Sequence, residues 1–346
     1  MPKRFLLLTI FSLLLQSCGS LSSLPLPEFS PNPTATGITE ILPTPVPPTE
    51  EIAVEIPDAT PTPLPLPKVS RVLIVSFDGL RPDAIIQGNM TTVLSLMQNG
   101  AYSLYAQTIM PSITLPAHSS MLVGTCPAKH IVRWNEYVPQ NGFAIGTDIF
   151  DIAHAAGLRT VFITGKEKLR QVTEPASTDF FGFVDKTDKI KDSKTVLGLA
   201  LEQLDEDFGL MFVHFAEGDI AGHEDGWMSR QQLEVYGRED KGFGRMIEKL
   251  KDNNMYDDTL IIVTSDHGGH DSTHGENIPE DMTIPWVISG PGIVTGELAT
   301  KIYTMDTAAT VAFALGLPIP AEWDGLPVYE AFGMPIDPYR NGGCGN

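Results

Sequence analysis

Apolar runs and amphipathic stretches alternate along the chain from about residue 69 onward. Short runs rich in Val, Ile, Leu and Phe predict strands. The predicted strands are 71–78, 102–109, 158–165, 209–219, 259–266 and 282–292. The stretches with a helical pattern are about 82–98, 147–157, 192–207, 229–252 and 306–316. Because strands alternate with helices, the sequence predicts an α/β fold with a mainly parallel central sheet that helices cover on both faces.

The first 18 residues form a separate pattern. A basic start is followed by an apolar run and by small residues around Cys18, as in a secretory signal peptide. The ending Leu-Gln-Ser-Cys also resembles a bacterial lipoprotein signal, in which Cys18 would carry a lipid anchor to the membrane. The alternative is an ordinary cleaved signal with an incidental cysteine. We expect an exported protein, lipid-anchored at the bacterial cell envelope, with its folded domain outside the cytoplasm.

Residues 19–68 are rich in Pro, Thr, Ser and Glu. Such a composition cannot bury enough apolar surface to fold, and it favours extended polyproline II segments. We therefore expect a disordered stalk over 19–68 and one folded domain over 69–346. An exported domain can pair Cys126 with Cys344, but two free thiols fit the sequence equally well.

The charge balance limits the partners of the domain. The 346 residues include 23 Lys and Arg against 43 Asp and Glu, which gives a net charge of -20. Stable binding of nucleic acid is not expected, because the sequence contains no cationic stripe for a phosphate backbone. An acidic protein can still act on small phosphate esters where bound metal ions invert the local field.

Three predicted strands end in aspartate, at Asp78, Asp219 and Asp266. The carboxyl ends of parallel strands meet at one edge of the sheet, so we expect the three carboxylates to converge there. Carboxylates crowded together repel one another and take up protons. A divalent cation between them would remove that conflict.

Histidines follow these aspartates at short spacings. His223 lies four residues after the second aspartate, His267 directly follows the third, and His274 returns on a short loop. His270 competes with His274 for a ligand role, and we favour His274 because of its His-Gly context. Carboxylate and neutral imidazole together suit Zn²⁺, with Mn²⁺ or Fe²⁺ as alternatives. The set exceeds the needs of one metal, so it predicts a pair of metals suited to phosphoryl displacement.

A candidate nucleophile lies in the segment SITLPAHSSMLVG. Thr114 stands just before Pro116, a position that suits the first turn of a helix. A hydroxyl there faces free backbone N–H groups and the positive end of the helix dipole, which favours a phosphate group. Metal coordination would lower the pKa of the hydroxyl and make it a nucleophile. The alternative is an ordinary residue at the start of a helix.

Four motifs now stand in a recognisable order: VSFDGLRPD, SITLPAHSSMLVG, EGDIAGHEDG and TSDHGG with a following His-Gly. This order resembles the alkaline phosphatase superfamily, and most closely its nucleotide pyrophosphatase/phosphodiesterase (type I phosphodiesterase) branch. The similarity extends from about residue 71 to 328. It implies the alkaline-phosphatase-like three-layer sandwich. The compact spacing of the last histidines is similar to small bacterial members of the branch.

The resemblance also implies roles for single residues, with two Zn²⁺ as cofactors. One zinc would be held by Asp219, His223 and His274. The other would be held by Asp78, Asp266 and His267, with Thr114 bridging toward it. Asn135 falls where this branch has an Asn that contacts a phosphoryl oxygen, and a turn or capping role is the alternative. In the family mechanism, the threonine attacks phosphorus and the resulting phosphothreonine is then hydrolysed.

The expected function is hydrolysis of phosphate esters by two metals, with phosphodiester or nucleotide pyrophosphate bonds as the targets. The expected partner is a small phosphate ester such as a nucleotide. A phosphomonoesterase on the same site is the first alternative, and a non-catalytic surface binding lipoprotein is the second. His118 and His214 are interpreted as orienting or core histidines. Arg81 and Lys166 are interpreted mainly as solvated cations, with substrate contact as the alternative.

Overall fold

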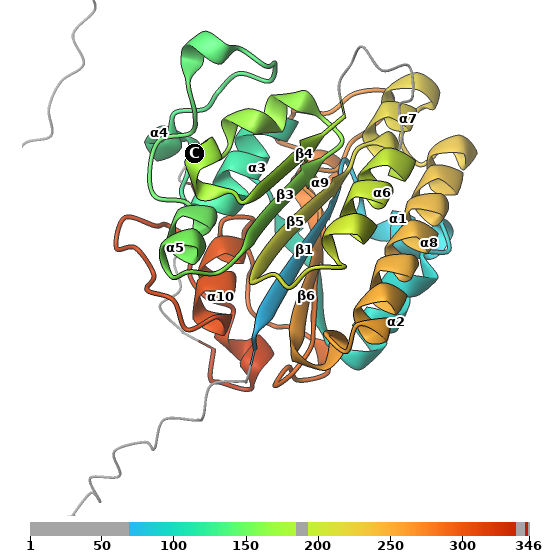
Figure 1. Ribbon diagram of the computed structural model, residues 1–346. Helices are drawn as coiled ribbons and strands as arrows, with labels where there is room; N and C mark the ends of the chain where they lie inside the picture. Colours follow the sequence, from blue (N-terminus) through green and yellow to red (C-terminus); the bar gives the residue numbers. More distant parts are fainter. Residues whose placement is uncertain (1–68, 185–192, 337–342, 345–346) are drawn as a thin grey trace, which may run out of the picture. The chain divides into compact units, whose positions relative to one another are not determined.

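The computed structural model describes residues 69–184, 193–336 and 343–344 (Figure 1). The predicted signal peptide, Cys18 and the predicted stalk all lie outside these residues. Within the described part, no helix has the length and apolar character needed to cross a bilayer.

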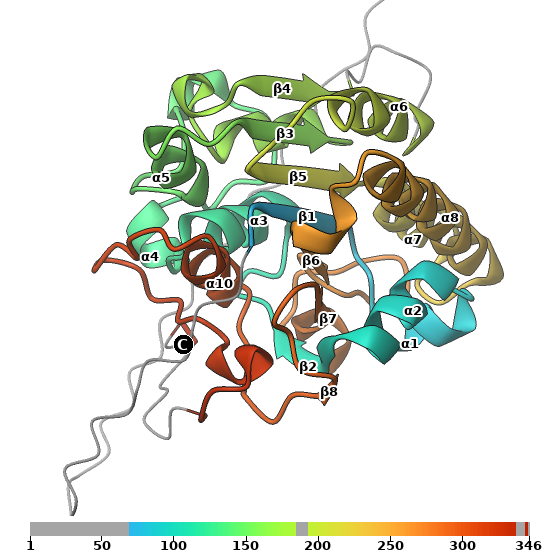
Figure 2. The same cartoon turned by 60° about the horizontal axis from the view of Figure 1, so that its bottom comes forward.

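In the described part of the chain, one eight-stranded sheet forms the centre (Figure 2). Its strands are β1 (Arg71–Phe77), β2 (Ala101–Gln107), β3 (Thr160–Thr164), β4 (Phe180–Phe183), β5 (Leu210–Phe215), β6 (Thr259–Thr264), β7 (Thr283–Ser289) and β8 (Gly296–Glu297). The spatial order is β4-β3-β5-β1-β6-β7-β2-β8. Only β7 runs antiparallel to its described neighbours, β6 and β2. The mainly parallel sheet expected from the sequence is therefore confirmed.

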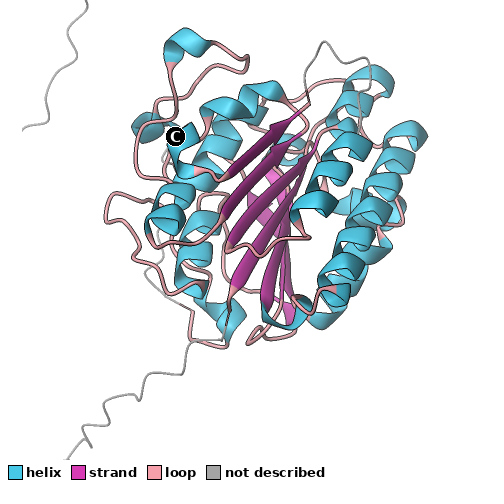
Figure 3. Ribbon diagram, in the orientation of Figure 1, coloured by secondary structure: helices cyan, strands magenta, loops and turns pink. Residues whose placement is uncertain are grey.

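Helices cover both faces of this sheet, as Figure 3 shows. The α-helices are α1 (Pro82–Gln87), α2 (Thr91–Asn99), α3 (Thr114–Val123), α4 (Pro127–His130), α5 (Ile149–Ala155), α6 (Ser193–Gln203), α7 (Glu217–Asp225), α8 (Arg230–Asp252), α9 (Pro279–Met282) and α10 (Asp306–Ala314). The 3₁₀ helices are η1 (Pro139–Asn141), η2 (Glu167–Gln171), η3 (Pro175–Ser177), η4 (Tyr256–Asp258) and η5 (Tyr329–Phe332).

Alternate side chains of the central strands build two separate cores. Val72 and Ile74 of β1 belong to the core beneath α3, α5 and α10. Leu73 and Val75 belong to the opposite core, beneath α1, α2, α6 and α8. Because successive strand residues point to opposite faces, a strand buried on both sides appears in the sequence as an unbroken apolar run. This is the three-layer arrangement that the sequence predicts.

The helix predicted over 82–98 is wrong in one respect, because the structure divides it into α1 and α2. Asn89 between them has the left-handed φ of 51°, which ends the first helix. The second helix begins where the carboxylate of Asp240 in α8 accepts hydrogen bonds from the backbone N–H groups of Thr92 and Val93, at 2.9 and 3.0 Å. This cap comes from a residue far along the chain, so the local pattern does not reveal the break.

The strand predicted over 209–219 is also wrong at its end, because β5 stops at Phe215 and α7 follows. Asp219 therefore lies in the first turn of a helix and not at a strand end. A Cβ on Gly218 would lie 2.0 Å from the ring of Tyr236, so glycine allows α7 to pack directly against α8. Glycine is a poor helix former, which hides α7 from a propensity argument. The short strands β4 and β8 were not predicted either.

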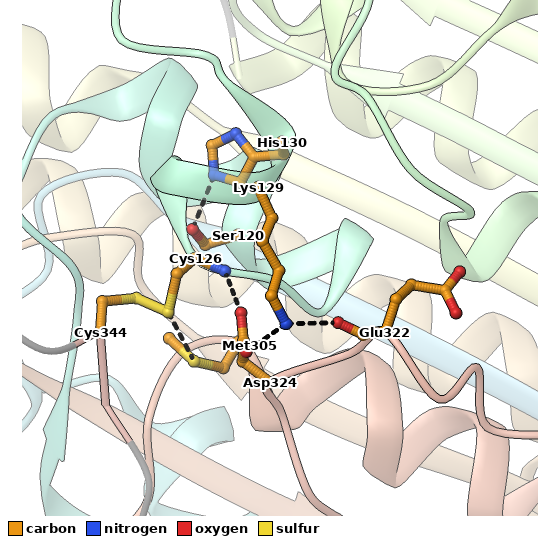
Figure 4. Close-up of a disulfide and its surroundings, with 8 residues drawn as sticks. All are labelled: Ser120, Cys126, Lys129, His130, Met305, Glu322, Asp324 and Cys344. Carbon is orange, nitrogen blue, oxygen red and sulfur yellow. Dashed lines mark hydrogen bonds and ion pairs between the residues drawn. A yellow bond between two sulfur atoms is a disulfide. The ribbon is translucent and has the colours of Figure 1, made fainter.

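Cys126 and Cys344 form a disulfide, with their Cα atoms 5.4 Å apart (Figure 4). The bond lies just beyond the end of α3. Asp324 accepts a hydrogen bond from the backbone N–H of Cys126 at 2.8 Å and pairs with Lys129 at 2.6 Å. The disulfide thus joins the C-terminal segment to the loop that follows α3.

Candidate active site

The three aspartates predicted to converge do meet at the carboxyl edge of the sheet. Asp78 directly follows β1 and Asp266 lies two residues beyond β6, and both are fully buried. Asp219 approaches from α7 and is 3% exposed. The backbone N–H of Gly79 donates to Asp266 Oδ1 at 3.1 Å, which links the ends of β1 and β6. The adjacent strands β5, β1 and β6 thus bring the carboxylates together.

Asp219, His223 and His274 form what we call the outer group. Asp219 Oδ1 lies 3.4 Å from His223 Nε2 and 3.5 Å from His274 Nε2. The ligand atoms of all three side chains lie within 4.8 Å of one another. The structure thus brings together the set that the sequence analysis assigned to one metal.

Asp78, Asp266 and His267 form what we call the inner group. His267 Nε2 lies 3.5 Å from Asp78 Oδ1 and 3.3 Å from Asp266 Oδ2. Asp219 also lies within 4.8 Å of the ligand atoms of Asp78 and His267. The two groups therefore meet at Asp219, a sharing that the sequence analysis did not predict.

All three histidines present a bare nitrogen to a carboxylate. The Nδ1 atoms of His223, His267 and His274 lie 2.8 to 3.0 Å from backbone carbonyl oxygens, so each Nδ1 carries the proton and donates it. In the neutral ring, Nε2 is then unprotonated and carries a lone pair. The distance from this nitrogen to the nearest carboxylate oxygen is 3.3 to 3.5 Å. A lone pair on nitrogen and a carboxylate oxygen repel each other, so this arrangement is stable when a cation lies between the two atoms. Metal-binding histidines typically have this carbonyl partner on the far nitrogen.

Burial reinforces this arrangement. It lowers the pKa of His267, and it lowers the pKa of His274 to about 4, so both rings stay neutral near neutral pH. Burial, with the charge of Asp78 beside it, raises the pKa of Asp266 well above its usual range. Four of the proposed ligand atoms are buried without a hydrogen-bond partner among the described residues: Asp78 Oδ1, Asp219 Oδ1, Asp266 Oδ2 and His267 Nε2. Divalent cations would satisfy these atoms, so the residues fit a metal centre.

A second layer of histidines lies beneath the inner group. His214 Nε2 donates to Asp78 Oδ2 at 2.9 Å, and its Nδ1 lies 3.1 Å from the hydroxyl of Thr164. His118 Nδ1 donates to the carbonyl of Thr114 at 2.9 Å. Both rings are fully buried. As interpreted from the sequence, His118 contacts the helix that begins at Thr114, and His214 is a hydrogen-bonded core histidine; the contact of His214 with the carboxylate of Asp78 was not predicted.

Thr114 is the first residue of α3, as the sequence predicts for a hydroxyl at a helix start. Its side chain reaches the same edge of the sheet, where Oγ1 accepts a hydrogen bond from Lys166 at 3.3 Å. Asn135 lies nearby and accepts a hydrogen bond from the backbone N–H of Leu115 through Oδ1, at 3.0 Å. Asn135 therefore caps the first turn of α3, which is the alternative role expected for it from the sequence.

Lys166 is the main site residue that the sequence analysis undervalued. Its ammonium lies 2.7 Å from Asp78 Oδ2 and 2.6 Å from Asp219 Oδ2. Burial alone would lower the pKa of Lys166, but the two carboxylates outweigh burial and raise that pKa. A signal was present, since Lys166 follows a predicted strand whose carboxyl end lies at the same edge.

His270 is turned away from both groups. Its Nδ1 lies 2.7 Å from Asp281 Oδ1, and the other oxygen of Asp281 accepts the backbone N–H of Glu276 at 2.8 Å. These bonds hold the loop that carries His267 and His274. The structure thus places His274, and not His270, beside Asp219, in agreement with the preference drawn from the sequence.

Comparisons of the sequence with known proteins find relatives. The catalytic subunit of human GPI ethanolamine phosphate transferase 2 is 27% identical over 291 residues, which cover 76% of this chain and 28% of that protein. Mouse ectonucleotide pyrophosphatase/phosphodiesterase family member 7 is 25% identical over 240 residues, which cover 63% of this chain and 54% of that protein. The chain thus spans between about a quarter and about half of the length of these relatives.

Solved structures show the same fold. Murine ectonucleotide pyrophosphatase/phosphodiesterase 5 superposes with a TM-score of 0.60 at 15% identity, over 76% of this chain and 99% of that chain. The alkaline-phosphatase-like fold expected from the sequence is thereby confirmed. The family model of type I phosphodiesterase / nucleotide pyrophosphatase matches residues 72–285, more than half of the chain. The chain belongs to the type I phosphodiesterase / nucleotide pyrophosphatase family, whose members are hydrolases of phosphoric esters.

Proposed function

We propose that this protein hydrolyses phosphodiester or nucleotide pyrophosphate bonds with two bound divalent metals and Thr114 as the nucleophile. One observation carries the proposal: three imidazole lone pairs face carboxylate oxygens, and the threonine hydroxyl lies beside the lysine that pairs with two of those carboxylates. A non-catalytic binding protein would have no need for a buried hydroxyl at this place.

The metals would be held by the inner and outer groups. Zinc suits the mixed set of imidazole and carboxylate, with Mn²⁺ or Fe²⁺ as alternatives. Bound there, two dications would lower the pKa of the hydroxyl and neutralise charge on the transferring phosphoryl group. His214, which donates to the far oxygen of Asp78, would fix the orientation of that ligand.

The chain's own residues then define the reaction. Thr114 Oγ1 loses its proton and attacks phosphorus, the bond from phosphorus to the leaving oxygen breaks, and the leaving group takes up a proton and departs. The phosphoryl group remains on Thr114 as an ester and keeps its second substituent when the substrate is a diester. Water hydrolyses this ester and restores the hydroxyl. The hydrogen bonds from His118 to the Thr114 carbonyl and from Leu115 to Asn135 hold the first turn of α3 in place, so the nucleophile is already positioned. The positive end of the α3 helix dipole favours the negative charge of the phosphoryl group.

A nucleotide-type substrate is supported by the family. Curated relatives include an ectonucleotide pyrophosphatase/phosphodiesterase, and an inactive variant of the murine structural relative has been solved in complex with AMP. We propose a small nucleotide or related diester as the substrate of this chain. The net charge of -20 argues against a nucleic-acid polymer.

Phosphomonoesterase activity is the second candidate, and Lys166 favours it. A monoester carries two negative charges near neutral pH where a diester carries one. The ammonium that lies 3.3 Å from Thr114 Oγ1 is therefore of more use to a monoester.

Steady-state kinetics on the zinc-loaded protein test the proposal. The substrates are bis- and mono-p-nitrophenyl phosphate and a nucleotide pyrophosphate, and the variants are Thr114→Ala and the exposed control Thr295→Ala. We expect about two metals per chain by elemental analysis and a loss of roughly a thousandfold or more in kcat for Thr114→Ala only. Equal rates for wild type and Thr114→Ala would contradict the nucleophile, and a strong preference for the monoester would favour the second candidate.

We also propose that the protein is exported and anchored at the cell envelope through Cys18. The disulfide between Cys126 and Cys344 supports this location, because disulfides persist in oxidising compartments. Metabolic labelling with a radioactive fatty acid tests the anchor: wild type should be labelled and membrane-bound, and Cys18→Ser should be unlabelled. Equal labelling of both would contradict it.

A further inference from the structure

We infer that Lys166 is a catalytic residue, a third cation that binds the phosphoryl group at Thr114 and raises the preference of the site for dianionic phosphate monoesters relative to diesters. The inference rests on the proposed function of the same site. It adds a substrate-selecting role to a residue outside both metal-ligand groups.

The contacts of Lys166 leave the metal-ligand atoms free. The ammonium uses Oδ2 of Asp78 and Oδ2 of Asp219. The Oδ1 atoms of the same carboxylates face the histidines of the inner and outer groups. Lys166 and the metals would therefore take different oxygens of the shared carboxylates. The lysine does not need to leave the site when the metals bind.

The backbone around Lys166 fixes this position. Gly165 donates to the carbonyl of His214 at 3.0 Å, and a Cβ on Gly165 would lie 2.7 Å from Cβ of Ala216. Only glycine allows the end of β3 to lie this close to the end of β5. The backbone N–H of Lys166 also donates to the hydroxyl of Thr164 at 3.0 Å. The side chain thus starts from a constrained turn directed at the carboxyl edge of the sheet.

The position next to the nucleophile gives the ammonium its role. Lys166 Nζ lies 3.3 Å from Thr114 Oγ1, the atom to which the phosphoryl group becomes bonded. The remaining phosphoryl oxygens surround that atom, so one of them lies within reach of the ammonium. Lysine is protonated at neutral pH, and Lys166 forms ion pairs with the carboxylates of Asp78 and Asp219. It therefore offers a permanent positive charge to the substrate.

Phosphate monoesters and diesters differ in the charge of the phosphoryl group. The phosphoryl group of a monoester keeps two negative charges on Thr114, whereas that of a diester keeps one and carries an organic substituent. A fixed cation stabilises the first more than the second, because hydrogen bonds between charged groups are the stronger ones. Specificity is the difference between these two stabilisations.

The test measures binding as well as rate. Zinc-loaded wild type, Lys166→Met, Lys166→Gln and Lys166→Arg are titrated with inorganic phosphate by calorimetry, with the exposed Lys241→Met as the matched loss of one charge. We expect phosphate affinity to fall by roughly tenfold or more in Lys166→Met and Lys166→Gln. Lys166→Arg should stay within about threefold of wild type, and Lys241→Met should not change. The ratio of kcat/KM for mono- over bis-p-nitrophenyl phosphate should fall by a similar factor in the two neutral variants.

The variants differ in their risk. Lys166→Met removes the cation that pairs with two buried carboxylates and can unfold the protein, whereas Lys166→Gln retains hydrogen-bond donors. The glutamine variant therefore decides the outcome. Unchanged phosphate affinity and an unchanged substrate ratio in folded Lys166→Gln with full zinc content would overturn the inference. An equal fall in kcat/KM for the monoester and the diester, with normal phosphate affinity, would also overturn the inference. Such a result would indicate that Lys166 has a purely structural role. In either case the proposed function would still hold if the wild-type protein hydrolyses the substrates and Thr114→Ala does not.

Discussion

The inner and outer groups both consist of aspartate and histidine side chains, but their surroundings differ. Every member of the inner group is fully buried and follows a central strand directly or within a few residues. In the outer group the side chain of His223 is 44% exposed, and the members come from α7 and from the loop after β6. The sheet therefore sets the geometry of the inner group, whereas a helix and a loop set that of the outer group.

The support behind the two groups differs as well. Buried imidazoles, His214 and His118, contact the ligands and backbone at the inner side. The outer histidines have backbone carbonyls of Ser272 and Ser112 as partners, and both belong to loops. We therefore expect the inner group to be the more rigid of the two, and His223 is the member of the outer group that solvent reaches most.

The largest expected effect comes from removing one histidine of each group. For His267→Ala we expect kcat/KM to fall by about a thousandfold or more, since a bound metal contributes several kcal/mol to transition-state stabilisation. For His223→Ala we expect a smaller fall, on the order of a hundredfold, with one tightly held metal remaining per chain. Kinetics and elemental analysis on both variants check this. Equal losses of metal and activity in the two variants would break the comparison.

A smaller effect is expected from the layer beneath the inner group. In His214→Ala, Asp78 loses the donor at its Oδ2, so its carboxylate is less well oriented. We expect the tighter metal affinity to fall by about 10- to 100-fold and the weaker one to remain unchanged. Competition with a zinc indicator dye measures both. A loss confined to the weaker site would show that His214 serves the outer group instead.

The smallest expected effect concerns the loop that carries His274. The hydrogen bond to Asp281 raises the pKa of His270 above its ordinary value. The protonated pair therefore stabilises the fold below about pH 6.5, and this contribution is lost as the pH rises through the higher folded-state pKa. After chelation of metals, wild type should unfold about 1–2 °C above His270→Gln at pH 5.5. The gap should narrow at pH 9, and a gap that widens there would contradict the assigned charge.

The inner group could be predicted from the sequence because its members directly follow long apolar runs. The convergence of Asp78, Asp266 and His267 needed only the rule that parallel strands end at one edge, whereas their assignment to one metal came from the resemblance to the family. Asp219 lies beside His223 and His274 although its element was predicted wrongly, since β5 and the first turn of α7 reach the same edge. Strand ends are thus predictable even where the next element is not.

Lys166 and the disulfide needed information that local patterns do not contain. A lysine in a loop is normally solvated. The close approach of β3 to β5 at Gly165 directs the side chain of Lys166 toward Asp219 instead. Cys126 and Cys344 are 218 residues apart, so no periodicity relates them. The break between α1 and α2 likewise depends on Asp240, which lies in another helix. In each case the deciding contact is made in tertiary structure.

The covalent link beyond α3 has a practical consequence for production of the protein. A chain made in a reducing cytosol would keep Cys126 and Cys344 as thiols, and the segment after α3 would then lose its cross-link to the C-terminal residues. Recombinant material intended for kinetic work should therefore be secreted into an oxidising compartment or refolded with a thiol–disulfide couple.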